Sequence, residues 1–406
     1  MGFHPIVNIS HEMEEHIVEE SLISQPRRWS ERRTLNYMRK AISSGPRSGR
    51  RFSAGRRRGR IVLITLLVVV ILFSVGSFIS VKSLHDKNFQ RSDRPQFSKY
   101  LRYDDAPEYN KKIVQFKSGK NTLTGYIYGE GTEKGLIVLA HGLGAGAESY
   151  LPQIIYFLDK GWAVFTYDST GNHASEGKSM VGLAQSLLDL DAALTYVKGH
   201  DNLNHLPVML FGHSWGGYAV ASVLNYGHPV TAVASVAGYN SPMEILFEQA
   251  KDIMGPFAHV TYPFMWLYQN MLFGKTALAK AVDGINKTAV PVMIIHGDAD
   301  NVISYTGAAT IAHRNEITNP NVVYKTCSKE GHNGHSNLFF SEATMRYRAE
   351  KNQEYKELDE RYGGDIPDNI KAAYYEGIDR FRSSELDSEF MDEINEFFER
   401  ALETYD

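Results

Sequence analysis

The sequence predicts an α/β fold: a mostly parallel eight-stranded sheet with helices on both faces, preceded by one transmembrane helix. Two observations predict it. An uncharged, mostly apolar run fills residues 61–81, and beyond it strand-length apolar runs alternate with stretches of helical periodicity. Several of these runs, such as LIVLA and VMIIH, are apolar throughout, which is typical of strands covered on both faces.

The apolar run at residues 61–81 is long enough to cross a membrane. As a helix it would extend about 31 Å at ~1.5 Å per residue, against a hydrocarbon core of roughly 30 Å. A cleavable signal peptide is the alternative, because Ser74 and Gly76 offer small residues two positions apart. The segment before it would be unusually long for such a peptide, and the apolar run continues past that point. We therefore expect a retained signal-anchor helix.

Charge differs on the two sides of this run. Residues 1–60 carry 13 basic and six acidic side chains, a formal charge of +7, which leaves −11 for the rest of the 406-residue chain. The positive-inside rule then places residues 1–60 in the cytoplasm, as a basic and disordered head, and the body outside or in a lumen. A polar linker is expected over 82–108, and a chain starting near Arg91 is expected to be soluble and active.

Composition also limits the partners. An acidic body gives no reason to expect a nucleic-acid partner. The single cysteine, Cys327, excludes a disulfide within the chain and a Cys-rich metal module. The oligomeric state is left open.

Eight runs of the body are candidate strands, and the first two are so closely connected that they predict an antiparallel hairpin at one edge. The candidate strands are residues 112–116, 123–128, 135–140, 163–167, 208–211, 232–236, 292–296 and 322–325. Helical patterns lie between them at residues 150–158, 181–197 and 215–225.

Two stretches interrupt this alternation. Residues 239–289 contain three prolines and the aromatic-rich sequence FAHVTYPFMWLYQNMLF, which predicts a helical lid over a site; plain core helices are the alternative. Residues 338–385 are charged and helix-prone, and they predict a second helical insertion. Residues 386–402 have the apolar spacing of an amphipathic closing helix.

The sequence Gly212-His213-Ser214-Trp215-Gly216 follows an apolar strand and precedes an apolar helix. This is the context of a nucleophile elbow, where a sharp turn between strand and helix raises a serine hydroxyl above the sheet. A structural turn is the alternative. The strand and helix on either side favour Ser214 as a catalytic nucleophile.

A serine nucleophile needs a base, and the base needs an orienting acid. After Ser214 the stretch HGDADN ends a strand and offers Asp298 and Asp300, and the later stretch EGHNGH offers His332 and His335. The order Ser, Asp, His fits a hydrolase triad. We expect Asp300 and His332 to complete it, with Asp298 and His335 as the alternatives.

An oxyanion hole needs two backbone donors. One is expected from the Trp215 N–H and the other from the Leu143 N–H, because the glycines beside Leu143 let the loop after residues 135–140 fold back toward Ser214. The same loop, GLGAGA, with Asp168 about 20 residues on, also matches a dinucleotide-binding fingerprint. That alternative leaves Ser214 and Asp300 unexplained.

Together the motifs HGLG, DSTGNHASEG, GHSWGG, HGDAD and EGHNGH resemble the α/β-hydrolase superfamily, in particular its lysophospholipase, monoacylglycerol-lipase and serine-aminopeptidase-like branch. The resemblance covers roughly residues 110–337 and the closing helix, within a hydrolase domain expected over 109–406. It implies a serine hydrolase with the Ser214, Asp300, His332 triad and no cofactor or metal. The sequence departs from the family at Thr170, where the family's DxRGxG loop has Arg.

The expected substrate is a carboxylic ester, such as an acylglycerol or lysophospholipid, because the lid is aromatic and the enzyme is tethered to a bilayer through residues 61–81. Hydrolysis of a small amide or peptide is the alternative, and a non-catalytic binding domain is a further one. The lid aromatics, including Phe264 and Trp266, are expected to line the acyl cleft.

Overall fold

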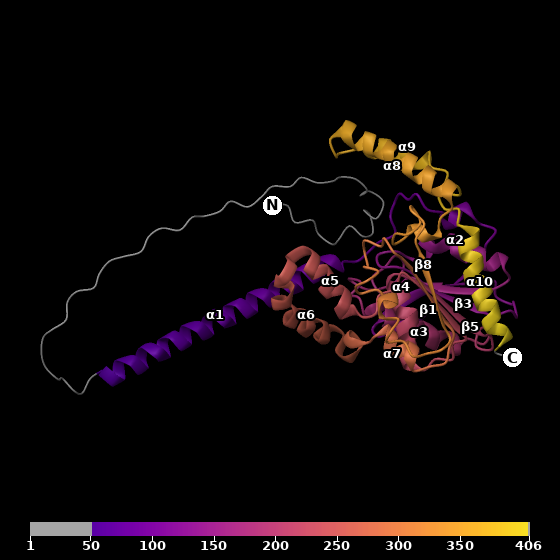
Figure 1. Cartoon of the computed structure of the whole chain (residues 1–406). Helices are drawn as coiled ribbons and strands as arrows, with labels where there is room; N and C mark the ends of the chain where they lie inside the picture. Colours follow the sequence, from indigo (N-terminus) through magenta and orange to yellow (C-terminus); the bar gives the residue numbers. More distant parts are fainter. Residues whose placement is uncertain (1–50, 405–406) are drawn as a thin grey trace, which may run out of the picture.

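A computed structural model of the protein describes residues 51–404, and its first element is the helix α1 (Arg51–Asn88). The disordered head predicted for residues 1–60 therefore lies outside the described residues, except that 51–60 form the start of α1. In Figure 1 this helix runs away from the body as one long rod, with α5 and α6 beside its C-terminal end. Among the described helices, one is long and apolar enough to cross a membrane, and it is this one.

The linker predicted to begin at residue 82 does not begin there. The helix continues to Asn88, and an ion pair one turn apart, between Lys82 and Asp86, supports these polar final turns. The segment after the helix is bound to the body. Arg91 donates to the carbonyls of His173, Ser175 and Gly177, and the Ser92 hydroxyl donates to the Gly144 carbonyl.

The body contains the eight-stranded, mostly parallel sheet that the sequence predicts, in the order β1-β2-β4-β3-β5-β6-β7-β8. The first two strands form the predicted edge hairpin, β2 is also antiparallel to β4, and the remaining pairs are parallel. The strands are β1 (Lys111–Ser118), β2 (Asn121–Tyr128), β3 (Leu136–Ala140), β4 (Ala163–Tyr167), β5 (Val208–His213), β6 (Ala232–Val236), β7 (Val292–Gly297) and β8 (Val322–Cys327).

Helices cover both faces of the sheet. On one face α3 (Gln185–Lys198), α4 (Trp215–Ser222) and α7 (Ala281–Asn286) bury side chains such as Leu190 and Ile285. On the other face lie α2 (Leu151–Asp159) and the closing helix α10 (Ser388–Glu403), whose Phe398 packs against Phe157. The central strands β3 to β7 are buried along their whole length, which explains why their sequences are apolar without alternation.

Both predicted insertions are helical. The first contains α5 (Pro242–Met254), which begins at an N-cap from Ser241, and α6 (Ala258–Phe273), followed by α7. The second contains α8 (Glu342–Tyr362) and α9 (Asp368–Glu376), separated at Gly363 and Gly364, which both adopt positive φ. In Figure 1 the α8–α9 pair projects from the top of the body, apart from α5 and α6.

Candidate active site

Ser214 occupies a strained turn between β5 and α4. Its φ of 58° and ψ of −114° lie outside the conformations that a serine normally prefers. The turn closes only because two glycines let backbones approach: a Cβ at Gly212 would collide with the Gly216 carbonyl, and one at Gly216 would collide with the Ala140 carbonyl. The predicted elbow is therefore present, with Ser214 at the N-terminus of a buried helix.

Three side chains form a continuous hydrogen-bonded chain at this turn. The Ser214 Oγ lies 2.8 Å from His335 Nε2, and His335 Nδ1 lies 2.7 Å from Asp300 Oδ2. Ser214 and Asp300 thus occupy the places that the sequence predicts. His332 does not: its Nε2 lies 3.4 Å from a carboxylate oxygen of Glu342. The choice of His332 over His335 is wrong.

The loop after β8 explains why the later histidine reaches the serine. The Asn333 carbonyl accepts from the Ala299 N–H, and the Asn333 amide donates to Asp298 at 2.7 Å. These bonds fix the loop against the end of β7, and His335 follows two residues later. Asp298, the alternative acid, therefore holds the loop and does not contact the histidine ring.

Asp300 is held as a carboxylate. Its Oδ1 accepts from the N–H groups of Val302 and Ile303, and its Oδ2 lies 3.0 Å from His296 Nε2 as well as close to His335. Burial opposes ionisation, but the charge of His335 and the hydrogen bonds from His296 and His335 outweigh it, so the pKa of Asp300 lies well below its ordinary value. Sequence reasoning missed His296, although it belongs to the HGDAD motif.

A second buried histidine links the base to the predicted oxyanion loop. His213 Nε2 lies 2.9 Å from the His335 carbonyl, its Nδ1 lies 2.7 Å from the Tyr150 hydroxyl, and that hydroxyl accepts from the Gly142 N–H at 3.0 Å. Burial, together with the charge of His335, lowers the pKa of His213 to about 3, which keeps the ring neutral. Neutral His213 can then donate at one nitrogen and accept at the other.

The two predicted backbone donors lie beside the serine. Leu143 and Trp215 border the same cavity as Ser214. Within the described part of the chain, neither the Leu143 N–H nor the Trp215 N–H donates to a protein acceptor. Both therefore remain available to an oxygen placed at Ser214.

An apolar cavity of about 520 Å³ opens at Ser214, within the range of ~300–1,000 Å³ that is usual for ligand pockets. Its walls come largely from α1, α5 and α6, and its lining within residues 51–404 contains no Asp, Glu, Lys or Arg. The lid prediction is right about the helices but wrong about most of the side chains. Among the described lining residues, the aromatic-rich stretch 257–273 supplies Thr261, Met265 and Gln269 but none of its aromatic side chains. Phe264 is not part of the lining, and Trp266 is 43% exposed.

A second cavity of about 630 Å³ also reaches Ser214 and His335. Its lining is more polar: it includes Tyr100 and Tyr150, and Arg348 and Tyr355 of α8. Ser214 and Leu143 border both cavities. The serine therefore lies where an apolar pocket and a polar pocket meet.

The dinucleotide alternative does not fit this site. Asp168 accepts from the Ala147 N–H at 2.8 Å and from the Tyr126 hydroxyl at 2.9 Å, so its carboxylate is engaged inside the protein. No group of three or more His, Cys, Asp or Glu residues within residues 51–404 is arranged to hold a metal ion.

The family described as serine aminopeptidase, S33, matches residues 131–274, which contain β3 to β6, the Ser214 turn and both lid helices. This match agrees with the sheet order and with the serine turn at the end of β5. The chain has the α/β-hydrolase fold. The matched segment does not include β7, β8 or the loops that carry Asp300 and His335.

The curated proteins that are similar in sequence match only part of this chain. The quorum-quenching protein AidA of Acinetobacter baumannii is 30% identical over 139 residues, which are 32% of this chain and 46% of AidA. The uncharacterized protein YfhR of Escherichia coli is 24% identical over 171 residues, 42% of this chain and 54% of YfhR. The chain thus spans about half the length of the curated relatives it matches.

Solved structures similar to this α/β-hydrolase include an esterase of Pyrococcus furiosus, with 18% identity, a TM-score of 0.47, and coverage of 67% of this chain and 98% of the esterase. The acylaminoacyl peptidase of Pyrococcus horikoshii is 17% identical, with a TM-score of 0.44 and coverage of 62% of this chain and 41% of the peptidase.

The geometry predicts that replacing His335 and replacing His332 by alanine affect the reactivity of Ser214 differently. We expect His335→Ala to slow labelling of Ser214 by a fluorophosphonate probe by at least ~10³-fold, because the serine loses the group that accepts its proton. His332→Ala is the matched control and should label within a few-fold of the wild-type rate. Equal loss of labelling in both variants, with both folded by circular dichroism, would contradict the assignment.

Proposed function

We propose that this protein is a membrane-tethered serine hydrolase that cleaves carboxylic esters with a long apolar acyl group. One observation carries the proposal: the hydrogen-bonded chain from Ser214 through His335 to Asp300 ends in an apolar cavity without charged side chains. A serine in this arrangement is activated for attack on a carbonyl, and the cavity accommodates an aliphatic chain on the acyl side.

The proposed reaction proceeds through an acyl-enzyme. The Ser214 Oγ attacks the carbonyl carbon while His335 Nε2 takes the hydroxyl proton, and the Asp300 carboxylate stabilises the resulting imidazolium. Collapse of the tetrahedral intermediate breaks the bond to the alcohol, which takes the proton back from His335. Water then repeats both steps on the acyl-Ser214 ester and releases the fatty acid.

The negative charge of each tetrahedral intermediate needs donors that are already in place. The Leu143 and Trp215 N–H groups are proposed for this role, because both border the cavity at Ser214 and neither has an acceptor within the described chain. The His213–Tyr150 link to Gly142 holds the neighbouring peptide in position. In this proposal His213 and Tyr150 are positioning residues.

Cleavage of an amide by an aminopeptidase is the second candidate, and the description of the matching family favours it. A substrate with a free amino group needs a carboxylate in the pocket. The apolar cavity has none, and Asp93 at the polar cavity is paired with Arg91 at 2.6 Å. These surroundings favour an ester. The polar cavity, which also borders Ser214, suits the alcohol that leaves.

We expect the full-length protein to hydrolyse p-nitrophenyl esters and to prefer long acyl chains to acetate, since each methylene that leaves water contributes up to ~0.8 kcal/mol. Aminoacyl p-nitroanilides should be poor substrates. Ser214→Ala should remove both activities while the protein remains folded. Faster turnover of the anilides than of any ester would favour the peptidase candidate.

We also propose that α1 spans a membrane with its Arg-rich N-terminal side in the cytoplasm and the hydrolase body outside. We expect the full-length protein to remain in the membrane pellet after carbonate extraction. Protease added to intact cells should digest the body and spare an N-terminal tag. A protected body with a digested tag would reverse the orientation.

A further inference from the structure

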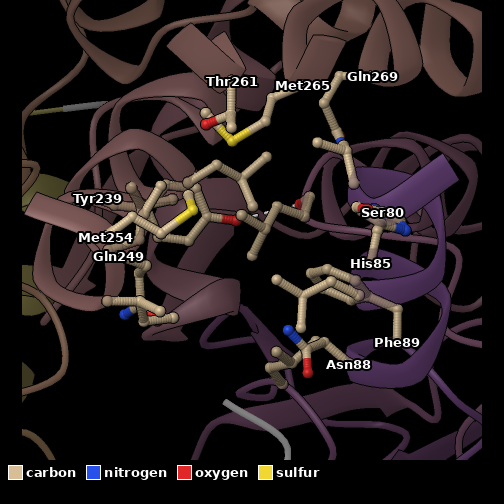
Figure 2. Close-up of a pocket in the computed structure, with 18 of the residues that line it drawn as sticks. Ser80, His85, Asn88, Phe89, Tyr239, Gln249, Met254, Thr261, Met265 and Gln269 are labelled. Carbon is tan, nitrogen blue, oxygen red and sulfur yellow. Dashed lines mark hydrogen bonds between the residues drawn. The ribbon is translucent and has the colours of Figure 1, made fainter. Parts of the chain in front are cut away.

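The helix that carries the apolar span also forms a wall of the acyl cavity. Eight residues of α1 line it, and Phe89 directly after the helix does so as well; the eight are Phe73, Gly76, Ser77, Ser80, Val81, Leu84, His85 and Asn88. Figure 2 shows Ser80, His85 and Asn88 across the cavity from Gln249 and Met254 of α5. The helix is thus part of the pocket.

The cavity follows α1 away from the serine. The end of the helix at Asn88 lies near the site, because Ser92 bonds to the Gly144 carbonyl beside Leu143. From there to Phe73 the lining extends over about 22 Å at ~1.5 Å per residue. Residues 73–81 belong to the apolar run 61–81, so the far end of the cavity lies at the depth of the proposed membrane span.

Small side chains on α1 keep this part of the cavity open. Gly76, Ser77 and Ser80 face the lid, and a Cβ added at Gly76 would meet no heavy atom within 4 Å. Aromatic contacts join α1 to α6 beside them, with ring centroids 6.4 Å apart for Phe73 and Phe264 and 5.8 Å apart for Phe78 and Tyr268.

The outer side of α6 is itself apolar. The helix has no Asp, Glu, Lys or Arg in its 16 residues. Several of its large apolar side chains are nevertheless exposed, namely Val260, Tyr262, Trp266, Leu267, Met271 and Leu272. The apolar run of α1 is exposed as well, and the Phe73–Phe264 contact joins the two helices, so both members of the pair carry exposed apolar side chains.

The cavity also offers hydrogen bonds to an occupant. Among the described residues, the Gln269 Oε1, the Asn88 Oδ1 and the His85 Nε2 have no hydrogen-bond partner, and the His85 Nδ1 lies 3.7 Å from a carboxylate oxygen of Asp86. Gln269 is 1% exposed and His85 is 7% exposed, and both border the cavity. Polar atoms that are buried in this way are normally satisfied by a ligand or by water.

We propose that α1 and α6 lie side by side in the outer leaflet and that the cavity between them takes the acyl chain of its substrate directly from the bilayer. The inference rests on the proposed ester hydrolysis and adds the source of the substrate, a lipid that resides in the membrane. The anchor is then not separable from the enzyme. A chain starting near Arg91 would lack this wall, so under this proposal it loses activity on long-chain esters, whereas the sequence alone predicts a soluble and active chain.

The test uses the full-length protein in phosphatidylcholine nanodiscs, with 4-methylumbelliferyl acetate and palmitate as substrates. Gly76→Phe fills the far part of the cavity. Val75→Phe is the matched control: it introduces the same ring at the same depth, on the side of α1 where Val75 is 53% exposed and does not line the cavity.

We expect Gly76→Phe to lower kcat/KM for palmitate at least tenfold, because the chain loses its site, and to leave acetate within about twofold. Val75→Phe should change neither. An unchanged palmitate-to-acetate ratio in Gly76→Phe would overturn the role of α1 while ester hydrolysis stands. Absence of hydrolysis of both esters by the wild type would instead refute the proposed function.

A second arm identifies what covers α6. The fluorescence of Trp266 is obtained as the difference between the wild type and Trp266→Phe. In nanodiscs with acyl-brominated lipid this fluorescence should be quenched, because bromine in the hydrocarbon contacts the exposed indole. Emission from Trp266 that no brominated lipid quenches, together with a doubled mass per nanodisc, would show a second copy of the chain on this face and overturn the bilayer assignment.

Discussion

The close approach of three backbones at Ser214 is the constraint on which the site depends. Gly212, Gly216 and the end of β3 at Ala140 come so near one another that no side chain fits between them, and this packing maintains the positive φ of the serine. The turn places the hydroxyl above the central strands, where the loops after β3, β7 and β8 bring the remaining groups. A fold that did not pack α4 tightly under β3 would leave the serine in an ordinary turn.

Hydrogen bonds connect the serine turn to the loops that carry the base and the proposed oxyanion donors. His213, next to the serine, contacts the carbonyl of His335 and, through Tyr150, the peptide at Gly142. Burial keeps His213 neutral, so the same ring fixes the base on one side and the oxyanion loop on the other. The base, the acid and the proposed oxyanion donors are therefore linked through neutral groups as well as through the charged pair.

Much of the fold was predictable from sequence because it rests on local signals. Fully buried strands read as unbroken apolar runs, and the glycines around Ser214 mark the only kind of residue that its turn accepts. The choice between His332 and His335 was not predictable. It depends on how Asn333 binds the end of β7, which is a contact between segments far apart in the chain. The part of α1 in the cavity was not predictable for a different reason. An apolar run long enough to cross a membrane is apolar on every side, so its sequence does not indicate that one face lines a pocket.

The most direct test of the account is to trap the acyl-enzyme. Full-length protein in nanodiscs would be mixed with a long-chain ester, quenched in acid within milliseconds and analysed by peptide mass spectrometry. We expect the mass of the acyl group on the peptide that contains Ser214, with a smaller trapped fraction for acetate at the same concentration. An acyl group on a residue other than Ser214 would contradict the proposed acyl-enzyme. So would turnover of the ester with no trapped adduct in either the wild type or His335→Ala.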